Sequence, residues 1–189
     1  LDFQLVRARL RAQESSPADA VLAARSTLKD KRYSNETAAR YAMVTARLRA
    51  RQFKEAESEL QKLLSGAGSG DPMIQQLAAN TALAAGNQTL ALQRFQAGSS
   101  AYPGYRPLQY GYISALLAAG RSSEALAVAD KQLALYPLDR RLWRLAAQTH
   151  AQLGQHLLSH SAQAEAAALS GDLVAAIEQL TLGIKAGDG

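Results

Sequence analysis

The chain has 189 residues and a formal net charge of +5, and 48% of its residues are hydrophobic, whereas only 6% are aromatic. Alanine and leucine supply most of the hydrophobic content and β-branched residues are sparse, which favours helices and argues against a sheet protein. The sequence has no cysteine, which excludes disulfides and thiolate metal sites, and it has no apolar run of the roughly 18 residues that a membrane-spanning helix needs.

The positive charge is concentrated in the N-terminal part. Residues 1–54 contain 12 Lys or Arg and 5 Asp or Glu, a balance of +7, whereas the remaining residues contain 9 and 11, a balance of −2. The arginines of this part are expected either to lie on solvated helix faces or to meet an acidic partner, a neighbouring domain or anionic lipid headgroups. No aromatic residues interleave with them in an RNA-reading pattern, so nucleic acid is disfavoured. The six in question are Arg7, Arg9, Arg11, Arg47, Arg49 and Arg51.

The first four predicted helices form two hairpins. Residues 2–14 and 17–31 make the first, because Ser16 is a suitable N-cap and Pro17 suits the first position of a helix. Residues 35–50 and 53–64 make the second, with apolar residues at helical spacing and a turn near Arg51 and Gln52.

A glycine-rich segment follows at residues 66–70. It does not qualify as a phosphate-binding loop, because no strand precedes it and no Lys-Ser or Lys-Thr pair follows it. We expect one domain over residues 1–189, consisting of basic hairpins (1–65), this loop as a mild hinge (66–70), and better-formed repeats with a C-terminal capping helix (71–189).

Turn-forming residues then recur every 17 residues, which is the length of one helix plus one turn. The lattice extends upstream to Ser69, Gln52 and Asn35, and helices are expected at 72–85, 88–101, 105–119, 122–135, 139–153, 155–170 and 172–186. Two such units give a 34-residue repeat of the tetratricopeptide (TPR) type, a helix hairpin that buries its apolar face only when a neighbour stacks on it. The turn residues are Gly86, Pro103, Gly120, Pro137, Gly154 and Gly171.

Residue types inside the period also match tetratricopeptide repeats. The small residue Ala91, the bulky residue Phe95 and the closing Pro103 recur in the next unit as Ala125, Ala129 and Pro137. Alanine allows close approach of two helices, and proline ends a helix because it lacks an N–H. The predicted fold is therefore all-α, a right-handed α–α superhelix of about eleven antiparallel helices.

Two groups of residues raise the question of catalysis. His156 and His160 have the spacing of the H-E-x-x-H zinc protease motif, but Leu157 replaces the general-base glutamate, so we expect no metal here. Glu55 and Glu59 form a carboxylate pair, which we expect to be solvated on a helix surface near Lys62. No catalytic residue is predicted, and the chain is expected not to be an enzyme.

A binding surface is the remaining candidate site. The first helices of successive tetratricopeptide repeats line a concave groove, where tyrosine and arginine act as anchors and amides pair with peptide backbone. The alternative is that these polar residues are merely solvated. The predicted partner-binding residues are Tyr41, Thr45, Gln76, Asn80, Tyr110, Ser114, Arg141, Arg144 and Gln148.

The two ends of the chain resemble a known family. HSAQAEA at 160–166, GDL at 171–173, AAIEQL at 175–180 and GDG at 187–189 look like the closing segment of BepA-like proteases, the β-barrel assembly-enhancing proteases of Gram-negative bacteria. FQLVRARL at 3–10 is similar to the stretch that follows the zinc-protease domain of that family.

This resemblance implies a periplasmic protein whose metalloprotease domain degrades stalled outer-membrane proteins. Its TPR domain would dock on the barrel-assembly machinery, on misassembled outer-membrane proteins and on its own protease domain, without membrane insertion. The chain has no H-E-x-x-H motif, so the implied zinc belongs to the parent protein, and no cofactor is expected in this fragment. The alternative is a free-standing TPR scaffold or adaptor in bacterial secretion or pilus assembly.

Overall fold

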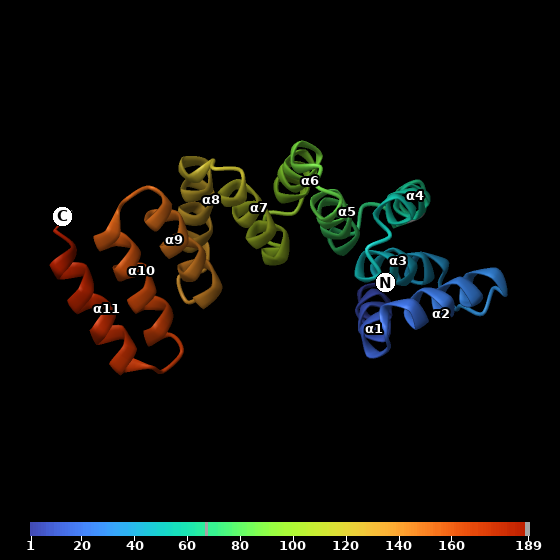
Figure 1. Cartoon of the computed structure of the whole chain (residues 1–189), viewed down its shortest axis with the longest axis horizontal. Coiled ribbons are helices and arrows are strands. Elements are labelled where there is room, and N and C mark those ends of the chain that lie inside the picture. Colours follow the sequence, from blue (N-terminus) through green and yellow to red (C-terminus); the bar gives the residue numbers. More distant parts are fainter. Residues whose placement is uncertain (67, 188–189) are drawn as a thin grey trace. The chain divides into compact units, whose positions relative to one another are not determined.

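The computed structural model describes residues 1–66 and 68–187, and in these residues it contains eleven α-helices and no strand (Figure 1). The predicted all-α fold is confirmed, and the helix boundaries lie within two residues of those expected from the sequence. The helices are α1 (Asp2–Glu14), α2 (Pro17–Lys29), α3 (Glu36–Arg49), α4 (Phe53–Leu64), α5 (Pro72–Ala84), α6 (Gln88–Ala101), α7 (Arg106–Ala118), α8 (Ser122–Leu135), α9 (Arg140–Gln152), α10 (His156–Ala168) and α11 (Leu173–Ala186).

The helices are distributed over two compact units, Leu1–Tyr102 and Pro103–Gly189. The first unit contains α1 to α6 and the second contains α7 to α11. The glycine-rich segment, where the sequence suggests a hinge, falls within the first unit, between α4 and α5. Its residue 67 lies outside the described residues, and the hinge stays a prediction. The assignment of residues 1–189 to a single domain stays a prediction.

Within each unit, helices that follow one another in the chain pack side by side. The first helices of successive hairpins also contact one another, as α1 does with α3, α3 with α5, and α7 with α9. Each hairpin therefore covers the apolar face of the one before it, which is the stacking that helical repeats require.

The cores of the units contain the residue types that the repeat pattern predicts. Ala91, Ala125 and Ala129 are fully buried, and Phe95 is 1% exposed. Alanine lets neighbouring helix backbones approach closely, and the phenyl ring fills the wider space left between hairpins. The prediction that these positions form the packed seam is confirmed.

Arg94 connects three helices of the first unit by hydrogen bonds. The guanidinium of Arg94 on α6 donates to both carboxylate oxygens of Glu57 on α4, at 2.6 and 3.1 Å, and to the carbonyl of Ala78 on α5 at 2.9 Å. The hydrogen bond from Arg94 lowers the pKa of Glu57, although burial opposes the change. This bidentate pair fixes the register of α4 and α6.

The turns that join the two helices of several hairpins contain a left-handed residue. Gly86, Gly120 and Gly154 adopt φ values of 78°, 71° and 73°, a region that favours glycine because it has no Cβ. In the turn from α3 to α4 this position is occupied by Arg51, with φ of 58°. Arg51 lies 35 residues before Gly86, one more than the repeat length, so the upstream lattice is displaced by one residue from the predicted Gln52.

Replacing Arg51 by glycine is expected to stabilise the protein by about 1 kcal/mol, because it removes the steric cost of a Cβ in the left-handed region. Urea denaturation followed by far-UV circular dichroism measures the change. Arg51→Ala is the control, because it removes the guanidinium but keeps the Cβ, and it should give no comparable gain. Equal stabilities of the two variants would contradict the explanation.

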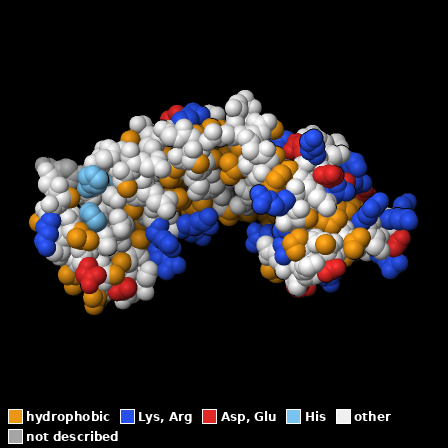
Figure 2. Space-filling model, in the orientation of Figure 1, with side chains coloured by type: hydrophobic (Ala, Val, Ile, Leu, Met, Phe, Trp, Pro, Cys, Tyr) orange, Lys and Arg blue, Asp and Glu red, His pale blue; other side chains and the backbone are white. Residues whose placement is uncertain are grey.

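The last helix presents an apolar outer face. Leu173, Ile177, Leu180 and Ile184 recur at helical spacing on α11, and their exposed fractions range from 49% to 81%. Figure 2 shows hydrophobic side chains gathered over this helix, at the lower left of the view. A helix that caps an array usually has a polar outer face, and the capping role of α11 stays a prediction.

Candidate functional site

The second unit brings together the predicted binding residues of α7 and α9, which we name the α7–α9 face. The guanidinium of Arg141 lies over the ring of Tyr110, 4.5 Å from its centroid, which is a cation–π arrangement. Ser114 lies one turn beyond Tyr110, and Arg144 and Gln148 lie one and two turns beyond Arg141, so they share a face with that pair. Ser114, Arg141, Arg144 and Gln148 are exposed.

Tyr110 itself is held by an internal network. Tyr110 is 8% exposed, and its hydroxyl donates a hydrogen bond to the carboxylate of Asp139, the residue that caps α9. Burial is the main reason that the pKa of Tyr110 is raised to about 12, and the carboxylate of Asp139 adds to the effect. The phenol therefore remains protonated at neutral pH and serves as a donor that positions the α7–α9 face.

The carboxylate of Asp139 accepts hydrogen bonds from four groups. The backbone N–H groups of Arg141 and Leu142 donate to its Oδ1 at 2.9 and 3.2 Å, and Arg106 donates to its Oδ2 at 2.8 Å, beside the hydroxyl of Tyr110. Burial raises the pKa of Asp139, but these hydrogen bonds outweigh burial and the net change is a lowered pKa. Periodicity predicts Asp139 as a helix boundary but does not reveal this role.

The predicted binding residues of the first unit are less accessible. Tyr41 on α3 is 4% exposed, and the hydroxyl of Thr45 donates to the backbone carbonyl of Tyr41 at 2.9 Å. On α5, Gln76 is half-buried, whereas Asn80 is exposed. The roles of these residues in binding stay predictions.

The two spaced histidines lie on α10. Nδ1 of His160 is 2.9 Å from Oε1 of Gln179, so this imidazole is engaged between α10 and α11. In the described part of the chain, no three His, Cys, Asp or Glu side chains are placed to hold one metal ion. The structure thus supplies two imidazoles without further ligands at this point.

The expectation that Glu55 and Glu59 form a solvated pair is wrong for Glu59. Glu55 is exposed, but Glu59 is 7% exposed, and its carboxylate accepts a hydrogen bond from Arg40 on α3 at 2.6 Å. Lys62 lies 3.3 Å away. Glu59 therefore connects α4 to α3, and its role is structural.

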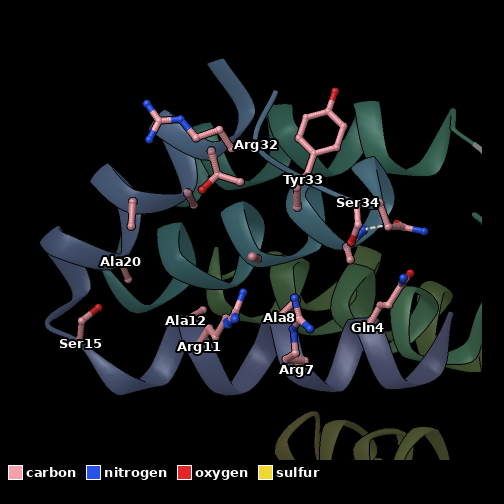
Figure 3. A pocket seen from close by; sticks show the side chains of 17 residues that line it. Gln4, Arg7, Ala8, Arg11, Ala12, Ser15, Ala20, Arg32, Tyr33 and Ser34 are labelled. Carbon is pink, nitrogen blue, oxygen red and sulfur yellow. Dashed lines mark hydrogen bonds between the residues drawn. The ribbon is translucent and has the colours of Figure 1, made fainter. Parts of the chain in front are cut away.

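The first unit contains a pocket that the repeat pattern does not reveal, and we name it the α1–α2–α3 pocket. It has a volume of about 230 Å³. Small side chains of the three helices form its walls, and Arg7, Arg11, Arg32 and Tyr33 stand around it (Figure 3). The available signal is the repetition of alanine at the positions where the three helices face one another: Ala8, Ala12, Ala20, Ala23, Ala24, Ala38, Ala39 and Ala42.

The hairpins, their left-handed turn residues and their stacking define a helical solenoid of tetratricopeptide type. Residues 82–149 match the family described as Tetratricopeptide repeat. A search of the curated protein sequences found no match. No helix in the described residues combines the length and apolar character that crossing a bilayer requires.

Several solved structures are similar to the chain. MamA (residues 41 to the end) from Desulfovibrio magneticus RS-1 has a TM-score of 0.62 at 18% identity, covering 81% of this chain and 96% of MamA. YrrB, described as a TPR protein with an unusual peptide-binding site, has a TM-score of 0.65 at 17% identity, covering 95% of this chain and 91% of YrrB. The anaphase-promoting complex assembly Cut9–Hcn1 has a TM-score of 0.58 at 14% identity, covering 98% of this chain and 38% of the matched one. These similarities establish the fold.

Proposed function

We propose that this chain is a protein-interaction domain that uses the α7–α9 face to hold segments of partner proteins. The observation that carries the proposal is the exposed row Ser114, Arg141, Arg144 and Gln148 on adjacent first helices of two hairpins. Arginines beside an aromatic ring are frequent anchors of protein interfaces. The tetratricopeptide repeat match spans α7 and most of α9, and the similar protein YrrB is described as having a peptide-binding site.

The particular role that we propose is docking in the periplasm of a Gram-negative bacterium, as part of a BepA-like metalloprotease. The partners would be the outer-membrane barrel-assembly machinery and misassembled outer-membrane proteins, together with the protease domain of the same protein. The support is the resemblance of residues 160–166 and 175–180 to the closing segment of that family. Zinc and proteolysis would reside in the protease domain of the parent.

Site-specific photo-crosslinking in the cell envelope tests this proposal. A photoreactive residue at Ser114 or Arg144, which are exposed, is expected to capture components of the barrel-assembly machinery. The same residue at Asp130 or Lys131, exposed positions of α8, is the matched control and should capture much less. Capture of secretion or pilus components instead would favour the free-standing scaffold, and capture of cytosolic proteins alone would refute the periplasmic role.

A further inference from the structure

The α1–α2–α3 pocket is a cavity because the side chains that line it are too small to fill the space between the helices. Eight of the residues around it are alanines, contributed by all three helices, so methyl groups face a space of about 230 Å³. Close packing normally removes such spaces from a helical core. A cavity of this size with an apolar wall accepts one small side chain of a bound segment.

The charged residues that line the pocket are all positive. Among its lining residues there are three arginines and no aspartate or glutamate. Arg32 pairs with Asp30 at 2.8 Å, whereas no carboxylate of the described residues lies within ion-pair distance of Arg7 or Arg11. The unmatched positive charge therefore belongs to Arg7 and Arg11, and it attracts an anionic group.

A second hollow of the same unit, lined by Glu36, Arg40 and Lys62 among others, has no such imbalance. Arg40 pairs there with Glu36 at 2.6 Å, and Lys62 lies 3.3 Å from Glu59. Cations that already have carboxylate partners gain little from an anionic ligand. This contrast singles out the α1–α2–α3 pocket.

The position of the two arginines is fixed by the packing of α1. Arg7 and Arg11 are one helical turn apart, and both side chains project from α1 toward the pocket in Figure 3. α1 is held by Leu5, which is fully buried, and by Arg49 of α3, which donates to the backbone carbonyls of Ala12 and Ser15 at its C-terminal end. Two guanidinium groups are thus presented at the mouth of an apolar cavity.

We propose that the α1–α2–α3 pocket binds a carboxylate-bearing segment of a partner protein. Arg7 and Arg11 hold the carboxylate, and the neighbouring small apolar side chain enters the alanine-lined cavity. A guanidinium suits this task because its N–H groups match the two oxygens of a carboxylate. The inference rests on the proposed function, since it assumes that the chain binds protein segments, and it adds a second contact that is separate from the α7–α9 face.

Three acetylated peptides test the proposal. The first is Gly-Ser-Gly-Ser-Ala-Val with a free C-terminal carboxylate, the second is the same peptide with a C-terminal amide, and the third is amidated and carries glutamate in place of the second serine. Backbone amide shifts of the full ¹⁵N-labelled chain report the site and the affinity. We expect one or both carboxylate peptides to shift amides of Ala8, Ala24 and Tyr33, and to bind at least about tenfold more tightly than the uncharged peptide. The first and third peptides distinguish a terminal carboxylate from a side-chain carboxylate.

Three variants test whether Arg7, Arg11 and the cavity bind the carboxylate peptides. The double change Arg7→Gln and Arg11→Gln is expected to weaken binding of the carboxylate peptides about tenfold. Arg9→Gln removes an exposed arginine of the same helix that does not line the pocket, and it should leave the affinity within about twofold of the original. Ala24→Leu fills the cavity and keeps both arginines, so it should abolish binding without changing the charge.

The inference would be overturned by equal binding of the charged and uncharged peptides, or by a loss of affinity in Arg9→Gln as large as that of the double variant. The proposed function fails separately. If the peptides do not bind but crosslinking from Ser114 captures envelope proteins, only the inference falls. If carboxylate peptides bind the pocket but crosslinking captures no envelope protein, only the proposed function falls.

Discussion

Asp139→Ala is expected to destabilise the second unit by about 3 kcal/mol. The change removes the acceptor of two backbone N–H groups at the start of α9, which costs about 1 kcal/mol. It also leaves the buried hydroxyl of Tyr110 without its acceptor, which costs a further 1–3 kcal/mol, roughly. The loss of the ion pair with Arg106 adds little to this destabilisation, because the side chain of Arg106 is 51% exposed.

Trp143 provides the measurement, since it is the only tryptophan of the chain and lies on α9. Its indole N–H donates to the carbonyl of Pro137 at 2.7 Å, so its fluorescence reports on the segment that Asp139 caps. Urea denaturation followed at Trp143 gives the loss of stability. The control Asp139→Asn keeps one oxygen for the cap. Its amide NH2 group takes the other position and can donate to the hydroxyl of Tyr110, so this variant should lose only about 1 kcal/mol.

The stability that the carboxylate of Asp139 contributes should decrease in acid. The folded pKa of Asp139 is lowered, so its carboxylate contributes stability above the unfolded pKa, and this contribution is lost as the pH falls through the folded pKa. With an ordinary aspartate pKa of about 3.9, the difference in stability between the original chain and Asp139→Asn should be constant above about pH 5 and shrink below about pH 4. A difference that grows in acid would contradict the assignment.

The sequence predicts the helices of this protein well because local signals agree at each boundary. Gly86, Gly120 and Gly154 end one helix and begin the next, and each adopts the left-handed conformation that only glycine enters without strain. Arg51 shows the limit of that signal. It takes the same conformation with a Cβ, so nothing in its residue type marks the turn, and the 17-residue spacing places it only to within one residue.

The candidate sites are harder to predict, because they depend on contacts between residues far apart in the chain. Repeat positions correctly bring Tyr110 and Arg141 together, but they do not reveal that the tyrosine is buried against Asp139. The α1–α2–α3 pocket is missed for the same reason. Alanine at a helix interface indicates close packing in α6 and α8, whereas in α1 and α2 it leaves a cavity, and only the spacing of the helices distinguishes the two outcomes.

Glu59→Ala is expected to destabilise the first unit by about 2 kcal/mol, although its sequence pattern is that of a solvated surface residue. Its side chain is 9% exposed and accepts from Arg40 at 2.6 Å, so the change deletes a partly buried ion pair between α3 and α4. Breaking a fully buried pair costs about 3–5 kcal/mol because the remaining charge has no partner. Here Arg40 keeps Glu36 at 2.6 Å, and its side chain is 27% exposed, which lowers the expected cost.

Glu55→Ala is the matched control, because Glu55 lies one turn earlier on α4 and is exposed. Its cost should stay below about 0.5 kcal/mol. Urea denaturation with far-UV circular dichroism compares the two variants, and amide hydrogen exchange of α3 and α4 localises the loss. Glu59→Leu combined with Arg40→Met should recover most of the stability, since apolar packing replaces a buried ion pair at little cost. If Glu59→Ala lowers the free energy of unfolding no more than Glu55→Ala does, the ion pair between Arg40 and Glu59 does not hold α3 to α4. Apolar packing between the two helices would then account for their contact.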